Sequence, residues 1–90
     1  MQQTISIRVQ GKVQGVYYRQ STREKAVELG ITGLVRNEPD GSVYIIATGS
    51  MENLQSLAEW CKKGPSRAIV THVETYVLED RNFKGFLITR

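Results

Sequence analysis

The sequence has little of the residue types on which common metal and thiol sites depend. Its 90 residues contain one cysteine, Cys61, and one histidine, His72. A single cysteine excludes an internal disulfide, and one cysteine with one histidine excludes a Cys/His zinc cluster within the chain. We therefore expect chemistry that needs neither a metal nor a cofactor.

Long apolar runs and blocks of charge are also missing. No stretch approaches the roughly 18 apolar residues of a membrane span, and residues 1–4 lack the features of a signal peptide. A cytoplasmic protein outside the membrane is the expectation. The net charge of +3 comes from dispersed lysines and arginines, which is weak support for a nucleic-acid partner.

The length fits one small domain with a single core. With 40% hydrophobic residues, the chain can bury one core but not two, and no low-complexity linker divides it. We expect residues 1–90 to form a single domain that is a monomer.

Hydrophobic periodicity predicts a regular order of strands and helices. Apolar and polar residues alternate in the strand-like segments, while the helix-like segments carry apolar residues at three- and four-residue spacing. Gly30 is a predicted stop of the first helix, and Ser50 is a predicted N-cap of the second. The predicted strands are residues 4–10, 32–37, 42–49, 68–79 and 86–90, and the predicted helices are residues 18–29 and 50–64. This order predicts an α+β, ferredoxin-like split β-α-β sandwich with two helices on one face of an antiparallel sheet.

Two residues with potential chemistry have simpler structural interpretations. Cys61 lies on the apolar stripe of the second predicted helix, so a buried structural thiol is favoured over a nucleophile. His72 lies near the start of the fourth predicted strand, where nothing in the sequence identifies a partner that would orient it as a base. We expect a surface or strand-edge histidine.

Residues 11–19, GKVQGVYYR, join the first predicted strand to the first helix. Gly11 and Gly15 permit positive φ, so successive backbone N–H groups can turn inward in front of the positive end of the helix dipole. Arg19 adds a guanidinium fork suited to phosphate oxygens. An ordinary strand-to-helix turn with an exposed arginine explains the local pattern about as well, because short glycine loops before helices are common.

Three segments together resemble the acylphosphatase family. Residues 11–19 fit the family signature Gly-x-Val-Gln-Gly-Val-x-(Phe/Tyr)-Arg at every defined position. Residues 33–43 resemble Gly-x-Val-x-Asn-x-x-Asp-Gly-x-Val, and residues 64–70 resemble Gly-Pro-x-x-Ala-x-Val. The resemblance implies the same ferredoxin-like fold. It also implies a hydrolase that converts a small acyl phosphate into a carboxylate and inorganic phosphate without metal or cofactor.

The resemblance also assigns the site residues. It implies that Arg19 binds the phosphate and that Asn37 holds the attacking water. The backbone N–H groups that complete the phosphate cradle are those of Gln14, Gly15, Val16, Tyr17 and Tyr18. In a split β-α-β unit the strand ending at Asn37 runs parallel to the first strand, so Asn37 lies at the same sheet edge as the loop. Without the resemblance, a hairpin cap is the first interpretation of Asn37.

Three other basic residues and two departures from the family pattern complete this interpretation. Lys12, Arg23 and Arg36 are predicted to be solvated charges. Leu34 stands where the family often carries an aromatic residue, and Glu38-Pro39 is an unusual lead into the Asp-Gly turn. Both bear on stability and loop shape before activity.

Two alternatives to catalysis share this order of elements. RNA-recognition domains expose aromatic residues on their two central strands, whereas here the first strand offers Ser6 and Arg8 and the third only Tyr44. No nucleic-acid partner is therefore expected. A regulatory domain that binds a small anion without turnover is the second alternative.

Overall fold

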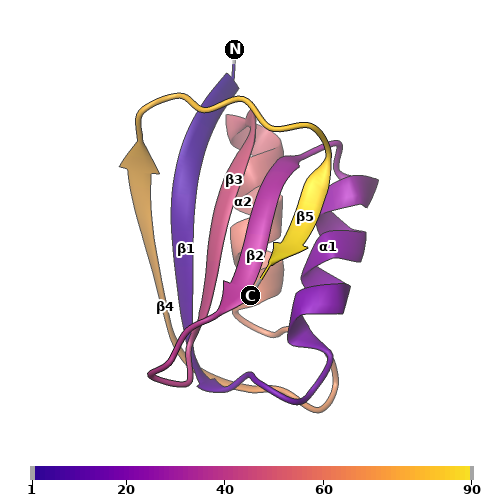
Figure 1. The fold of residues 1–90 in the computed structure, drawn as a ribbon, viewed down its shortest axis with the longest axis vertical. Helices are drawn as coiled ribbons and strands as arrows, with labels where there is room; N and C mark the ends of the chain where they lie inside the picture. The colour runs from indigo at the N-terminus through magenta and orange to yellow at the C-terminus, as the bar shows by residue number, and fades with distance from the viewer. Residues whose placement is uncertain (1, 90) are drawn as a thin grey trace.

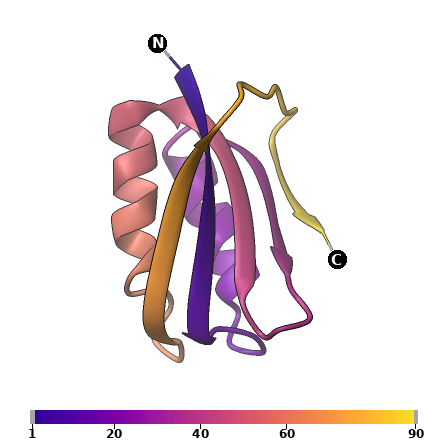
Figure 2. The ribbon, with the colours of Figure 1, turned by 90° about the vertical axis from the view of Figure 1, so that its left-hand side faces the viewer.

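Five segments pair into one sheet in the computed structural model, which describes residues 2–89. The strands are β1 (Gln2–Lys12), β2 (Thr32–Asn37), β3 (Val43–Ser50), β4 (Ile69–Leu78) and β5 (Phe86–Thr89). Their order across the sheet is β4-β1-β3-β2-β5. The helices α1 (Tyr18–Glu28) and α2 (Met51–Cys61) cover the same face (Figures 1 and 2). The predicted α+β, ferredoxin-like fold is confirmed.

The sheet is mixed, so the prediction of a wholly antiparallel sheet is wrong in one respect. β4, β1, β3 and β2 pair antiparallel, but β5 runs parallel to β2, with Gly33 opposite Phe86. The crossover of residues 79–85 carries the chain over the upper end of the sheet from one edge to the other (Figure 1). It is held by hydrogen bonds from Thr48 Oγ1 to the Arg81 carbonyl and from the Arg81 N–H to Thr4 Oγ1. Because the crossover spans the whole sheet, β5 enters beside β2 in the same direction.

The core lies between the sheet and the two helices. It joins the helix-facing side chains of the central strands to the apolar stripes of both helices. Its fully buried members include Ile7, Val9, Val35, Ile45, Ala26 and Leu57. The predicted helix signals are confirmed, because Gly30 has a φ of 70° and Ser50 Oγ accepts a hydrogen bond from the Asn53 N–H at 3.1 Å. Neither helix within residues 2–89 is long and apolar enough to cross a membrane.

The two residues set aside as structural lie where the sequence predicted. Cys61 is fully buried, and this burial raises the pKa of its thiol to about 12, so the reactive thiolate is suppressed at neutral pH. His72 lies on the edge strand β4 with its side chain 57% exposed. Neither residue is placed for nucleophilic or base catalysis.

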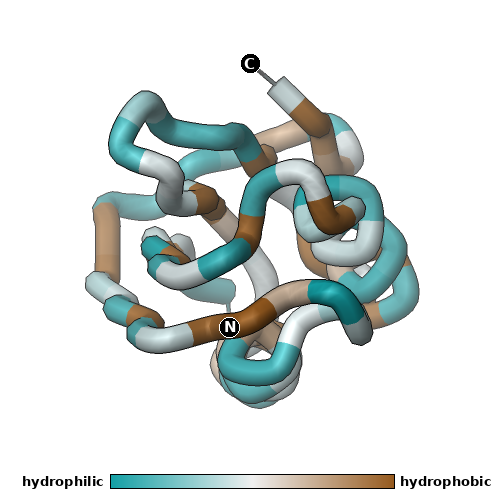
Figure 3. The backbone as a smooth tube through the Cα atoms, turned by 90° about the horizontal axis from the view of Figure 1, so that it is seen from below, coloured by the Kyte–Doolittle hydropathy of each residue, from teal (hydrophilic) through white to brown (hydrophobic). Residues whose placement is uncertain are grey.

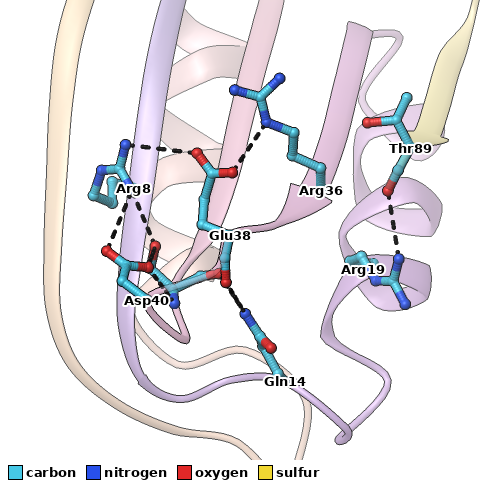
Figure 4. Close-up of polar contacts among 8 residues, drawn as sticks. Arg8, Gln14, Arg19, Arg36, Glu38, Asp40 and Thr89 are labelled. Carbon is cyan, nitrogen blue, oxygen red and sulfur yellow. Dashed lines mark hydrogen bonds and ion pairs between the residues drawn. The ribbon is translucent and has the colours of Figure 1, made fainter.

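On the face of the sheet away from the helices, Arg36 is not the solvated charge that the sequence predicted. Its Nε lies 3.3 Å from Glu38 Oε2, and its guanidinium lies 5.0 Å from the centre of the Tyr44 ring. Arg8 approaches the same ring from the neighbouring strand, with 5.1 Å between guanidinium and ring centre, and also pairs with Glu38 (Figure 4). Two guanidinium groups thus already lie over Tyr44, and a nucleic-acid base would have to displace one to stack there.

Candidate active site

Three connections meet at one end of the molecule, the lower end in Figure 1. They are the loop between β1 and α1, the turn between β2 and β3, and the connection from α2 to β4. β1 and β2 both pair antiparallel with β3, so they run parallel to each other and end at the same edge. Figure 3 views the molecule from this end and shows hydrophilic segments interspersed with hydrophobic ones.

An open cavity of about 400 Å³ lies among these segments. Its walls come from the β1–α1 loop, the first turn of α1, the ends of β2 and β5, and the α2–β4 connection. The lining residues are Val13, Gly15, Tyr17, Tyr18, Arg19, Gln20, Asn37, Arg67 and Ile88. The structure therefore brings Arg19 and Asn37 together with the predicted loop.

The β1–α1 loop has the backbone geometry of an anion nest. Gly15 has a φ of 74° and Tyr17 a φ of 63°, while Val16 between them does not have positive φ. Such alternation turns successive N–H groups toward one side, and here they precede the N-terminus of α1. Within residues 2–89, none of the N–H groups of residues 14–18 donates to a backbone carbonyl. These donors are available to a bound anion.

Tyr17 is the one non-glycine residue with positive φ in the described chain. A left-handed conformation costs a residue with a Cβ about 1–2 kcal/mol. The residue is 74% exposed, so packing of the ring does not offset this cost. Backbone strain of this kind concentrates at functional sites, which fits a loop shaped to bind a ligand.

Gln14 and Val16 are not among the residues that line the cavity, so a role for them in anion binding stays a prediction that concerns their backbone N–H groups. Gln14 Nε2 donates to the carbonyl oxygens of Glu38 at 2.8 Å and Ser42 at 2.9 Å (Figure 4 shows the first of these). Val16 is 5% exposed and packs into the core. The Gln14 amide thus ties the loop to the β2–β3 turn that follows Asn37.

This tie predicts a measurable effect on geometry. Gln14→Ala removes both hydrogen bonds and leaves two carbonyl groups without this partner, so we expect a loss of about 1–2 kcal/mol in the free energy of unfolding. Because the loop would then move relative to Asn37, kcat/KM should fall roughly tenfold. Denaturant unfolding and steady-state kinetics check the two effects. Wild-type kinetics in the destabilised variant would show that the tie does not position the site.

Arg19 projects from the first turn of α1 toward the end of β5 (Figure 4). Its Nη1 donates to the Thr89 carbonyl oxygen over a long 3.4 Å. One turn later on α1, Arg23 Nε donates to the Phe86 carbonyl oxygen at 3.0 Å, so Arg23 is not the simply solvated charge predicted from the sequence. A guanidinium carries five N–H donors, and the long contact to Thr89 leaves Arg19 with donors for a ligand.

Ile88 is a second correction on β5. The sequence predicted that it faces the core together with Phe86, but only Phe86 is buried, at 3% exposure, while Ile88 is 39% exposed and lines the cavity. β5 is a short strand at the edge of the sheet, paired with β2 on one side, which leaves its end partly open to solvent. β5 therefore forms one wall of the site.

Asn37 contributes an unpaired polar atom. Its Oδ1 is buried and has no hydrogen-bond partner in the described chain. The hairpin turn is closed without it, because Glu38 N–H donates to the Ser42 carbonyl at 2.9 Å and Ser42 donates its N–H and hydroxyl to Asp40 Oδ1. Both bonds lower the pKa of the Asp40 carboxyl group, the bond from the hydroxyl more than the bond from the N–H. An unpaired buried acceptor costs about 1–3 kcal/mol, so an acceptor retained at the cavity wall points to a donor brought by a ligand or a water.

Comparison with known proteins agrees with this geometry. Residues 5–88 match the family model described as Acylphosphatase. The chain belongs to the acylphosphatase family. It is 62% identical over 65 residues to an acylphosphatase from Marinobacter nauticus, covering 72% of this chain and 71% of that one. Family members are hydrolases, and this chain is accordingly an enzyme of the acylphosphatase type.

Two solved acylphosphatase structures share the fold over nearly the whole chain. One from Coxiella burnetii superposes with a TM-score of 0.95 at 36% identity, covering 98% of this chain and 93% of that one. One from Bacillus subtilis gives a TM-score of 0.94 at 32% identity, with complete coverage of both chains.

In this acylphosphatase-family site, sequence reasoning missed Arg67. The residue lies in the α2–β4 connection at a variable position of the third family segment, so neither the motif nor its exposed setting marked it. Arg19 and Arg67 are thus two arginines among the lining residues, and none of the described lining residues is acidic. The site is thus positively charged, as an anion site requires.

The nest geometry predicts the effect of one added methyl group. A Cβ at Gly15 meets no atom within 4 Å, but the φ of 74° disfavours alanine. Gly15→Ala should therefore cost about 1 kcal/mol of stability through backbone strain alone. If the loop relaxes to relieve this strain, its N–H groups diverge and the phosphate Ki rises. Thermal unfolding and phosphate inhibition measure both; an alanine variant with wild-type stability and Ki would contradict the nest.

Proposed function

We propose that the chain hydrolyses the carboxyl–phosphate bond of small acyl phosphates, with Asn37 orienting the water that attacks phosphorus. The loop N–H groups and Arg19 hold the phosphoryl group. The observation that supports this most strongly is the meeting, in one cavity, of free anion donors with the unpaired Oδ1 of Asn37. A water that donates to Oδ1 directs a lone pair away from it, into the space where a held phosphoryl group would lie.

The reaction balances without a protein base. The water oxygen forms a bond to phosphorus, and the bond from phosphorus to the carboxyl oxygen breaks, with its electron pair leaving on the carboxylate. Both protons of the water end on the released phosphate, giving H2PO4⁻ from a dianionic substrate. Since the carboxylate is a good leaving group, positioning and charge stabilisation by Arg19 and the loop can suffice.

Turnover of benzoyl phosphate tests this function against its alternatives. Release of benzoate and phosphate at a rate well above the spontaneous rate supports it. Binding of inorganic phosphate without turnover would instead indicate a regulatory anion-binding domain. A cytoplasmic monomer without a nucleic-acid partner stays a prediction from the sequence.

The chemical groups that line the cavity also predict how the enzyme responds to two additives. Inorganic phosphate should inhibit competitively, because it fits the same loop and Arg19 as the substrate. EDTA should leave kcat/KM unchanged, since the described cavity residues offer none of the carboxylates that hold Mg²⁺ or Ca²⁺. Steady-state rates with each additive check this prediction. Activity lost in EDTA and restored by Mg²⁺ would contradict the metal-free reaction.

A further inference from the structure

The cavity contains a cation that the proposed reaction does not use. Arg67 lines it from the α2–β4 connection. The residue is exposed, and within residues 2–89 its guanidinium forms no ion pair. Surface arginines are common, but this one shares a cavity with Arg19 and has no acidic neighbour in the lining.

The backbone on both sides of Arg67 is anchored to the phosphate loop. Ile69, two residues later, pairs with Lys12 at the end of β1, just before the loop begins. On the other side, Gly64 packs so closely on Tyr18 that a Cβ would lie 2.6 Å from the ring. Between these anchors the Ala68 N–H donates to the Pro65 carbonyl at 3.0 Å. The start of the Arg67 side chain is thus fixed relative to the loop.

The exposure of the lining residues separates an inner part of the cavity from an outer one. Tyr18 and Val13 are buried, whereas Tyr17 is 74% and Ile88 39% exposed, and Arg67 is exposed as well. If the loop and Arg19 hold the phosphoryl group in the inner part, the acyl group extends to the outer part. The exposed lining residues there are a tyrosine, an isoleucine and a second arginine.

We propose that Arg67 selects acyl phosphates whose acyl group carries a second anionic group, a carboxylate. This inference rests on the proposed function and adds the substrate class. Arg19 then faces the phosphoryl end and Arg67 the carboxylate end, where a guanidinium can bind both carboxylate oxygens. Because the contact lies away from the reacting bond, it stabilises substrate and transition state alike and acts on KM more than on kcat.

A rigid pair of substrates tests the inference. Benzoyl phosphate and 4-carboxybenzoyl phosphate differ only in a carboxylate that is too distant to react with the acyl phosphate. We expect Arg67→Gln to lower kcat/KM for the carboxylated substrate roughly tenfold more than for benzoyl phosphate, through KM. Arg67→Glu should widen the difference. Lys63→Gln is the matched control, because Lys63 is an exposed cation outside the cavity, and it should leave the ratio of the two substrates unchanged.

Two results would overturn the inference. An equal loss of kcat/KM for both substrates in Arg67→Gln would indicate that the guanidinium contacts the phosphoryl group. If Lys63→Gln changed the ratio of the two kcat/KM values as much as Arg67→Gln does, the effect would come from net charge alone. Failure of the proposed function looks different, because wild type would then turn over neither substrate. Calorimetry with benzoylphosphonate and 4-carboxybenzoylphosphonate makes the same comparison without turnover: selective weakening of the carboxylated ligand in Arg67→Gln supports the inference, and equal weakening opposes it.

Discussion

Asn37→Ala should abolish nearly all turnover while leaving the protein folded and able to bind phosphate. In the proposed reaction the side chain orients the attacking water and does not belong to the phosphate cradle. Its removal should therefore lower kcat by a factor on the order of 10² or more, the usual weight of nucleophile positioning. The Ki for inorganic phosphate should stay close to wild type, because Arg19 and the loop N–H groups are untouched.

The stability of this variant provides a second readout. Oδ1 of Asn37 is buried and unpaired in the described chain, so alanine removes a group that costs stability. The free energy of unfolding should stay equal or rise by up to about 1 kcal/mol, as is common where function opposes stability.

Asn37→Asp tests the charge of the site: a carboxylate there should raise the phosphate Ki by like-charge repulsion. A folded Asn37→Ala variant with wild-type kcat would contradict the proposal that Asn37 orients the water.

Arg19→Ala should damage both binding and catalysis. The guanidinium is expected to contact the phosphoryl oxygens in the bound substrate and to stabilise the charge that develops during transfer. We therefore expect kcat/KM to fall by about 10³, with a clear rise in phosphate Ki and a lower kcat. Arg19→Lys should restore little, because a point charge cannot reproduce two parallel N–H donors.

The matched control for this loss is Arg23→Ala. Arg23 lies on the same helix and donates to β5, as Arg19 does, but it does not line the cavity. Its loss should lower stability by about 1 kcal/mol through the Phe86 carbonyl and change kcat/KM only a few-fold. Steady-state kinetics and thermal unfolding of both variants give the comparison. If the two arginine variants lose activity equally, Arg19 acts through the packing of β5 and not on the phosphate.

The parts of the site that local sequence determines could be predicted. The glycine spacing of the loop and the arginine in the first helical turn are local features, and the parallel relation of β1 and β2 follows from the order of elements. Together these features are enough to place Arg19 and Asn37 at one edge of the sheet. The extent of β2 was likewise predicted to the residue, because the turn sequence EPDG of residues 38–41 follows it directly.

The rest depends on contacts between segments far apart in the chain. The wall formed by Ile88 exists because β5 pairs parallel with β2 after a crossover of the whole sheet, which no local pattern indicates. The Gln14 amide reaches carbonyls 24 and 28 residues away, and Arg67 enters the cavity only because β4 pairs with the end of β1. Arg36 was wrongly predicted to be solvated, because its partner Tyr44 lies on the neighbouring strand β3 and a local pattern does not show that contact.

The position of bond cleavage tests the central claim, attack of water on a phosphoryl group held in this cavity. Hydrolysis of benzoyl phosphate by the enzyme in H2¹⁸O, followed by mass spectrometry of both products, locates the oxygen from water. The account predicts that ¹⁸O appears in inorganic phosphate and that benzoate stays unlabelled. Label in benzoate would show attack at the carbonyl carbon and would contradict the roles assigned to Asn37, Arg19 and the loop.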